Sequence, residues 1–259
     1  MQSWRVAGIL VCNCRLKATY SISMRLGADS TGAAPGTELL VHWWLGENGM
    51  PTRIVLADDH ALVRQGIKSL LEREGLQIVG EASDGREAVQ HAEALSPDIV
   101  VMDIGMPTLN GMEAARELAR CCPKVKPILL TQHDEPQYVS AALKAGVKGY
   151  VLKSQVSSDL IHAIQQVMRG QVYLSPGISA AVMAAYHGKA EMPADPLTSR
   201  ERQVLQLIAE GKSTKDVAAL LGVSVKTAES HRSRLMQKLD IHETASLVRY
   251  AVKHGLVQI

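Results

Sequence analysis

Between residues 53 and 168 the chain repeats one pattern five times: a short apolar run followed by a segment with helical spacing. The apolar runs are Ile54–Ala57, Gln77–Ala82, Ile99–Met102, Pro127–Leu130 and Tyr150–Leu152. The expected helices cover residues 61–74, 85–94, 111–121, 136–145 and 156–168. Strands this apolar cannot face water on either side. The pattern therefore predicts an α/β fold with a doubly wound, parallel, five-stranded sheet covered by helices on both faces.

The sequence around this pattern divides into further parts. Residues 1–50 hold all three tryptophans and show no sustained period of 3.6 or 2. We interpret them as a non-native or disordered N-terminal extension ahead of Met50; an added regulatory arm is the alternative. We expect the α/β domain at residues 51–169. Residues 170–196 contain three prolines and read as a linker, with room for one helix over Ile178–Tyr186.

Residues 197–259 read as a compact all-α domain of four helices. Thr198 and Glu201 have the spacing of a capping box, which predicts a helix start. The helices are expected from Thr198 to Gly211, over 214–221, from the cap Ser224 to Leu239, and over 243–253, with Gly222 turning the chain. A helix, a glycine-containing turn and a longer helix form the helix-turn-helix arrangement.

Composition allows more than one core, since 46% of the 259 residues are hydrophobic and 21% are charged, and domains usually hold about 100 to 150 residues. Residues 51–169 carry 13 Lys and Arg against 15 Asp and Glu, whereas residues 197–259 carry 10 against 6. The C-terminal part is therefore basic. This balance suits a nucleic-acid-binding domain, although ordinary surfaces often carry such an excess.

The four cysteines form neither a disulfide framework nor a paired zinc motif, which favours a reducing compartment. No apolar run approaches the roughly 20 residues that a membrane span needs. We therefore expect a cytoplasmic protein that makes no use of a membrane.

Polar side chains follow four of the five predicted strands. Asp58 and Asp59 follow the first strand, Asp103 the third, Thr131 the fourth and Lys153 the fifth. Because the carboxyl ends of parallel strands meet at one edge of the sheet, these side chains should gather there, where such sheets bind ligands. Three neighbouring carboxylates repel one another unless a cation lies between them, and oxygen ligands suit Mg²⁺.

Such a site can accept a phosphoryl group. One carboxylate would act as the nucleophile, Lys153 would supply a second positive charge, and Thr131 would hydrogen-bond a phosphoryl oxygen. Each residue alone has an ordinary alternative, because an aspartate after a strand is often a turn or cap residue and a lysine is often a surface charge. Their joint placement favours function. We expect no functional role for His60, Cys121 and Cys122.

These residues resemble the receiver domains of two-component systems: D-D-H at 58–60, V-V-M-D-I-G-M-P at 100–107, Gly111, Thr131 and G-Y-V-L-K at 149–153. The resemblance covers residues 53–169 and implies a flavodoxin-like fold. It implies Asp103 as the phosphorylation site, Asp58, Asp59, Asp103 and the Gly105 carbonyl as metal ligands, Thr131 and Tyr150 as the switch pair, and Lys153 as the phosphate partner. Ser154 stands where many receivers have proline, which leaves the shape of that loop open.

The third helix of the C-terminal part has two different faces. An apolar stripe of Val225, Ala228, Leu235 and Leu239 is expected to face the core. Positions 224–239 carry four basic residues against one acid, which is typical of a helix in the DNA major groove, although an amphipathic surface helix can look similar. The residues expected at DNA are Lys226, Thr227, Glu229, Ser230, Arg232, Ser233, Arg234 and Lys238.

Within that set the basic side chains should contact phosphates, and Glu229 should accept from cytosine N4. Three segments resemble the LuxR-type helix-turn-helix of the NarL/FixJ class of response regulators: L-T-S-R-E-R-Q-V-L at 197–205, G-K-S-T-K-D-V-A at 211–218 and V-S-V-K-T-A-E-S-H-R-S-R-L-M-Q-K-L at 223–239. The resemblance implies a four-helix domain whose last helix supports dimer contact on a repeated DNA site.

We therefore expect a transcriptional response regulator in which a sensor histidine kinase phosphorylates Asp103. The phosphorylated form should be a homodimer on double-stranded DNA, with RNA polymerase as a further candidate partner. We expect the unphosphorylated receiver to cover the DNA-reading helix. Two alternatives stay open: a phosphorylation-independent DNA-binding regulator with a scaffold receiver, and an aspartate-nucleophile phosphatase. The phosphatase would need a second aspartate where Gly105 stands, and we do not expect a turnover enzyme.

Overall fold

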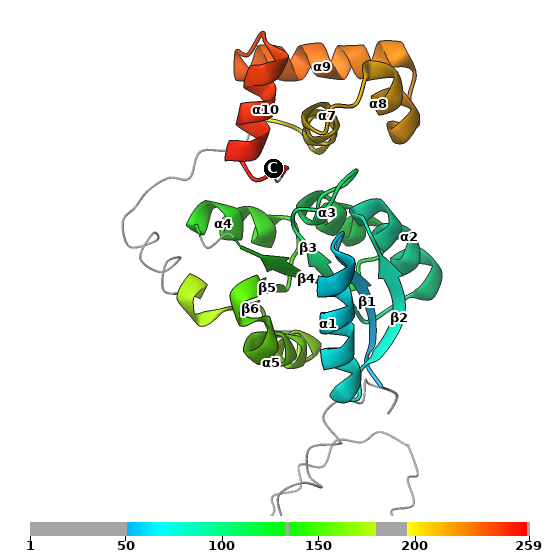
Figure 1. Cartoon of the computed structure of the whole chain (residues 1–259), viewed down its shortest axis with the longest axis vertical. Coiled ribbons are helices and arrows are strands. Elements are labelled where there is room, and N and C mark those ends of the chain that lie inside the picture. The colour runs from blue at the N-terminus through cyan, green and yellow to red at the C-terminus, as the bar shows by residue number, and fades with distance from the viewer. Residues whose placement is uncertain (1–50, 133–134, 180–195, 258–259) are drawn as a thin grey trace, which may run out of the picture. The chain divides into compact units, whose positions relative to one another are not determined.

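The computed structural model describes residues 51–132, 135–179 and 196–257. The interpretation of residues 1–50 lies outside the described residues, as does most of the helix expected over Ile178–Tyr186. Six strands form one parallel sheet in the order β2-β1-β3-β4-β5-β6 (Figure 1). The strands are β1 (Arg53–Ala57), β2 (Gln77–Ala82), β3 (Ile99–Asp103), β4 (Lys126–Thr131), β5 (Gly149–Leu152) and β6 (Tyr173–Leu174).

The prediction of a doubly wound parallel sheet is confirmed, but its count of five strands is one too low. The missed strand is β6, which pairs with β5 inside the segment interpreted as a linker. Two residues are too few to show a period, so no sequence pattern marks this strand.

Helices connect the strands and cover the sheet on both faces (Figure 1). They are α1 (Ala61–Arg73), α2 (Gly85–Leu95), α3 (Gly111–Cys121), α4 (Pro136–Lys144), the short 3₁₀ helix η1 (Lys153–Gln155) and α5 (Val156–Met168). Successive strand residues point to opposite faces. Val55 and Val100 pack with residues of α2, α3 and α4, whereas Ile54 and Ile99 pack with residues of α1 and α5. Each of these strand residues is fully buried, as a sheet covered twice requires.

The C-terminal domain consists of α7 (Ser199–Ala209), α8 (Thr214–Leu221), α9 (Val225–Leu239) and α10 (Thr244–Lys253), packed around one apolar core. The predicted capping box is confirmed, because Thr198 Oγ1 accepts from Glu201 N and Glu201 Oε2 accepts from Thr198 N. Gly222 takes a φ of 63° and turns the chain after α8. None of the helices described here is long and apolar enough to cross a bilayer.

One member of the predicted apolar stripe of α9 is misplaced. Ala228 and Leu235 are buried, and Leu239 packs against the core. Val225 is 40% exposed, so its prediction as a core residue is wrong. It is the first residue of α9, directly after the cap Ser224, and the core contacts of the helix begin one turn later.

Candidate functional site

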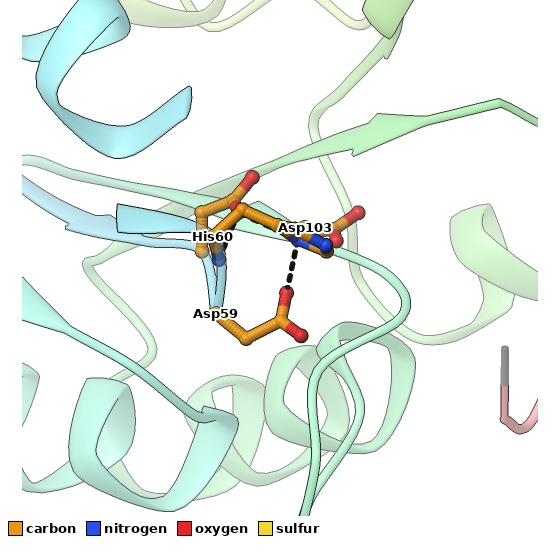
Figure 2. Close-up of side chains that lie close together, drawn as sticks. Asp59, His60 and Asp103 are labelled. Carbon is orange, nitrogen blue, oxygen red and sulfur yellow. Dashed lines mark hydrogen bonds and ion pairs between the residues drawn. The ribbon is translucent and has the colours of Figure 1, made fainter. Parts of the chain in front are cut away.

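Acidic side chains gather at the carboxyl ends of β1 and β3, where the order of the strands reverses. Asp58 follows β1 and is 0% exposed, and Asp103 ends β3 and is 1% exposed. One ligand atom from each of Asp58, Asp59, His60 and Asp103 lies within 4.8 Å of the others. Figure 2 shows Asp59, His60 and Asp103 side by side. The predicted gathering of the three aspartates at one edge of the sheet is therefore present.

Lys153 joins this cluster from the end of β5. Its Nζ lies 2.8 Å from Asp103 Oδ2 and 3.2 Å from Asp58 Oδ2. Burial alone would lower the pKa of Lys153, but the two carboxylates outweigh it and raise that pKa above its ordinary value. Lys153 therefore stays charged and balances part of the acidic cluster.

Asp103 has the most exceptional environment of these carboxylates. Burial raises the pKa of its carboxyl, and the opposing effect of Lys153 does not cancel this increase. Both carboxylate oxygens are buried without a hydrogen-bond partner among the described residues, so the ion pair with Lys153 is their main polar contact. Burial of such oxygens lowers the stability of the fold unless a cation or a hydrogen-bond donor lies beside them. The donor set, rich in carboxylate oxygen, fits a hard divalent cation.

His60 belongs to the cluster, although the sequence pattern favours an ordinary role for it. Its backbone N–H donates to Asp58 Oδ1 at 2.8 Å, and its Nδ1 lies 2.9 Å from Asp59 Oδ1 (Figure 2). The signal that could have pointed to it is its position directly after two aspartates at a strand end. Its side chain is 63% exposed, so it lies at the mouth of the cluster.

The other residues predicted for the site lie on the neighbouring strands and on the loop after β3. Thr131 ends β4 and is 1% exposed, while Tyr150 in β5 is fully buried in the core. Gly105 lies in the loop between β3 and α3. The end of that loop returns to its start, because Gly111 N donates to Ile104 O at 3.0 Å.

Gly111 allows this tight turn next to Asp103. A Cβ at this position would lie 2.2 Å from the carbonyl oxygen of Asp103, which is far inside van der Waals contact. The absence of a side chain therefore lets α3 begin directly against the end of β3. This close approach fixes the backbone on which Asp103 is carried.

The polar face predicted for α9 is exposed. Lys226, Thr227, Glu229, Ser230, Ser233 and Arg234 are all open to solvent. Arg232 is half-buried and donates to Thr244 Oγ1 at 3.0 Å, and Lys238 pairs with Glu201 at 2.6 Å while staying 38% exposed. That the unphosphorylated receiver covers the DNA-reading helix stays a prediction.

Comparison with known proteins identifies the two halves. The family described as the response regulator receiver domain matches residues 54–165, and the family described as bacterial regulatory proteins, luxR family, matches residues 195–251. Transcriptional regulatory protein MctR of Rhizobium johnstonii is 37% identical over 206 residues, covering 79% of this chain and 95% of that protein. The chain belongs to the LuxR-type response regulators.

Further relatives support this family assignment. Response regulator UvrY of Escherichia coli K12 is 37% identical, over 78% of this chain and 94% of that protein. A LuxR-family response regulator of Aurantimonas sp. matches with a TM-score of 0.51 and 35% identity, over 52% of this chain and 97% of that one. RcsB of Salmonella enterica, solved on promoter DNA with the phosphomimetic BeF₃⁻, matches with a TM-score of 0.55 and 27% identity, over 78% of this chain and 98% of that one.

Membership of this family excludes one of the alternatives. LuxR-type response regulators are regulators and not metabolic enzymes. The phosphatase alternative also needs an acid/base aspartate two residues after Asp103, where this response regulator has Gly105.

Proposed function

We propose that this response regulator is switched when a sensor histidine kinase transfers a phosphoryl group to Asp103. The observation that carries the proposal is the buried Asp103 carboxylate, which pairs with Lys153 and lies among further carboxylates at the carboxyl edge of the sheet. An Asp103 oxygen would attack phosphorus as the P–N bond of the kinase phosphohistidine breaks. An acyl phosphate forms on Asp103, and the kinase imidazole leaves with its electron pair and takes up a proton.

The surrounding residues have separate roles in this proposal. Lys153 stabilises the negative phosphoryl oxygens, because its ammonium already lies within 2.8 Å of Asp103. The Thr131 hydroxyl donates to a phosphoryl oxygen and Tyr150 repositions with it. Asp58, Asp59, Asp103 and the carbonyl of Gly105 would hold Mg²⁺, which supplies charge neutralisation for the phosphoryl group when bound.

The output of the switch is DNA binding by α9, in a domain that we place at residues 197–259, after a receiver at 51–169 and a linker at 170–196. The exposed polar face of α9 and the basic balance of this part support the assignment. Lys226, Arg232, Arg234 and Lys238 would contact phosphates. The shorter side chains of Thr227, Ser230 and Ser233 would reach base edges together with Glu229, an acceptor for cytosine N4.

Dimer formation would bring two such helices to a repeated DNA site. In α10 Leu247 and Ala251 are buried, whereas Ala245 and Arg249 are exposed and available for contact with a second copy. RcsB of Salmonella, a relative of this chain, has been solved on promoter DNA. RNA polymerase at the same promoter is a further candidate partner.

The proposal is tested by direct phosphorylation of the full chain. A small-molecule phosphoryl donor with Mg²⁺ should add one phosphoryl group, and peptide mass spectrometry should place it on Asp103. Removing Mg²⁺ with a chelator, or the substitution Asp103→Asn, should each abolish the mass increase. Phosphoryl transfer to another residue, or none in the presence of Mg²⁺, would contradict the proposal and favour the scaffold alternative.

A further inference from the structure

His60 brings a nitrogen donor to the acidic cluster at the end of β1 (Figure 2). Its Nδ1 lies 2.9 Å from Asp59 Oδ1 and 3.5 Å from Asp58 Oδ1. An oxygen of Asp103 lies within 4.8 Å of the donor atoms of these residues. Adjacent ligands of an octahedral ion with bonds of about 2.1 Å lie about 3 Å apart. The spacing therefore suits one ion that is bound by the three aspartates and the imidazole together.

The loop that carries three of these donors, residues 58–60, is held in place by the surrounding chain. The His60 N–H donates to Asp58 Oδ1 at 2.8 Å. Arg64 of α1 donates from Nη1 to the carbonyl oxygen of Asp58 at 2.6 Å and from its backbone N to that of His60 at 3.0 Å. Glu81 of β2 fixes the Arg64 side chain through an ion pair at 3.2 Å. These donors are therefore positioned before an ion binds, which lowers the entropic cost of binding.

Asp103 gives independent evidence that the cluster suits a cation. Its side chain is 1% exposed, and neither carboxylate oxygen has a hydrogen-bond partner among the described residues. Lys153 supplies one positive charge at 2.8 Å, which is less than the negative charge of the three ionised aspartates. A divalent cation balances the rest, and a neutral imidazole adds a ligand without adding charge.

The imidazole nitrogen changes which ion the site prefers. Carboxylate and carbonyl oxygens suit Mg²⁺, whereas imidazole suits iron, nickel, copper and zinc. For one set of nitrogen and oxygen ligands, affinity rises from Mn²⁺ through Fe²⁺ and Co²⁺ to Ni²⁺. The side chain of His60 is 63% exposed and that of Asp59 is 30% exposed, so an ion that enters from solvent meets these two residues first.

We propose that His60 Nδ1 is a ligand of the receiver's metal ion, so that the site binds first-row transition ions in preference to Mg²⁺. This role rests on the metal site of the proposed function, but it needs no transfer of a phosphoryl group. The neutral imidazole binds through Nδ1 and keeps its proton on Nε2. In the metal-bound chain His60 and Asp59 are then neighbouring ligands of one ion.

Electron spin-echo spectroscopy of the full chain with Mn²⁺, in the absence of a phosphoryl donor, tests the ligand directly. Bound Mn²⁺ should show coupling to the nitrogen nucleus of an imidazole. The coupling should disappear in His60→Asn, which offers an amide oxygen in place of the ring nitrogen. The matched control is His91→Asn, because His91 Nε2 also lies near a carboxylate, 3.6 Å from Glu87 Oε1, but outside the cluster. This control should keep the coupling.

Displacement of the bound Mn²⁺ by Ni²⁺ or Mg²⁺ measures selectivity at this site alone. Ni²⁺ should displace Mn²⁺ at much lower concentrations than Mg²⁺ does. His60→Asn should reduce this difference by at least about tenfold, the smallest effect typical of residues that only orient a ligand, and His91→Asn should not change it.

Bound Mn²⁺ without imidazole coupling in the unsubstituted chain would overturn the inference and leave a site made of oxygen ligands. Unchanged selectivity in His60→Asn would overturn it as well. If both metal measurements agree with the inference but Asp103 accepts no phosphoryl group, the role of His60 stands and the proposed function fails.

Discussion

Asp103 is subject to two opposing effects. Burial disfavours its charged form, and the Lys153 ammonium 2.8 Å away favours that form. Burial is the larger effect, so the pKa of Asp103 lies above its ordinary value. The ionised carboxylate that we propose as the nucleophile therefore lowers the stability of the metal-free protein.

The raised pKa of Asp103 predicts how stability depends on pH. A carboxyl with a raised pKa binds its proton more tightly in the folded state. The contribution of Asp103 to stability is therefore fully present below the pKa that this carboxyl has in the unfolded chain, about 3.9. It is lost as pH rises through the higher pKa of the folded chain. Between these two values we expect the Asp103 contribution to the free energy of unfolding of the metal-free chain to fall by at most about 1.4 kcal/mol for each pH unit.

Urea unfolding at a series of pH values, beside Asp103→Asn, measures this effect. The variant keeps the shape of the side chain without its titration, so the difference between the two proteins should grow as pH rises. Added Mg²⁺ should restore stability to the unsubstituted chain alone. A pH-independent difference would contradict the assigned environment of Asp103.

Gly111 allows the close approach of α3 to Asp103, and its substitution should be costly. In Gly111→Ala the new Cβ meets the Asp103 carbonyl oxygen at 2.2 Å, so the backbone must shift. We expect a loss of about 1–3 kcal/mol in the free energy of unfolding, together with slower phosphorylation.

The matched control is Gly66→Ala in the interior of α1, where no atom lies within 4 Å of a built Cβ. Helix propensity should make that variant more stable by about 0.5–1 kcal/mol. Equal effects of the two substitutions on unfolding would show that the approach at Gly111 is unimportant.

The site residues differ in how far the sequence could predict them. Asp58, Asp103 and Lys153 each follow a strongly apolar strand, and parallel strands bring such positions to one edge. The position of His60 beside the acidic cluster was not expected, because a histidine after two aspartates has no periodic signal and its position depends on the path of the chain after β1. The complete burial of the Asp103 oxygens could not be predicted either, because the burial of single atoms depends on packing.

Among the elements, helix starts were predictable where a side chain caps the backbone locally. Thr198 and Ser224 each accept from a backbone N–H three residues later. Strand β6 and the exposure of Val225 could not be predicted from the periodicity of apolar residues alone. Both depend on where neighbouring elements end, which is a tertiary property.

At the start of α7, the Glu201 side chain accepts a hydrogen bond from Thr198 N and forms an ion pair with Lys238. Burial alone would raise its pKa, but the bonds from Lys238 and Thr198 together lower it below the ordinary value. A carboxylate with a lowered pKa contributes stability above the unfolded value of about 4.3, and that contribution is lost as pH falls through the folded value.

We therefore expect Glu201→Gln to lower the free energy of unfolding of this domain by about 1 kcal/mol at neutral pH, with the difference disappearing in acid. Chemical unfolding at neutral and acidic pH checks both points. The control is Glu243→Gln at the start of α10, where the side chain makes no cap hydrogen bond. A difference for Glu201→Gln that persists in acid would contradict the ionic part of this account.

Helix α9 should interact with DNA partly through charge. Arg234 is exposed on it, and a lost phosphate contact should reduce the slope of log affinity against log salt by about 0.9. DNA titrations of Arg234→Ala at several salt concentrations measure that slope. Arg120→Ala at the exposed end of α3 is the control, and equal slopes for the two variants would contradict the assignment.

For the whole molecule, the sequence predicted both folds, because each has its own pattern. Apolar runs alternate with helical segments over residues 53–168, and capped amphipathic helices follow from Thr198. The way in which the receiver acts on the LuxR-type domain has no such pattern, because the spacing of polar residues on a helix does not separate a solvent-exposed face from one that contacts another domain. That the unphosphorylated receiver covers α9 therefore stays a prediction.

The central claim is that phosphorylation of Asp103 controls DNA binding. The most direct test measures the sedimentation and DNA affinity of the full chain with and without a phosphoryl donor and Mg²⁺, beside Asp103→Asn. We predict donor-dependent dimers and tighter binding in the unsubstituted protein, and neither change in the variant. Identical binding and sedimentation in all conditions would contradict the account and leave a helix-turn-helix that acts without its receiver.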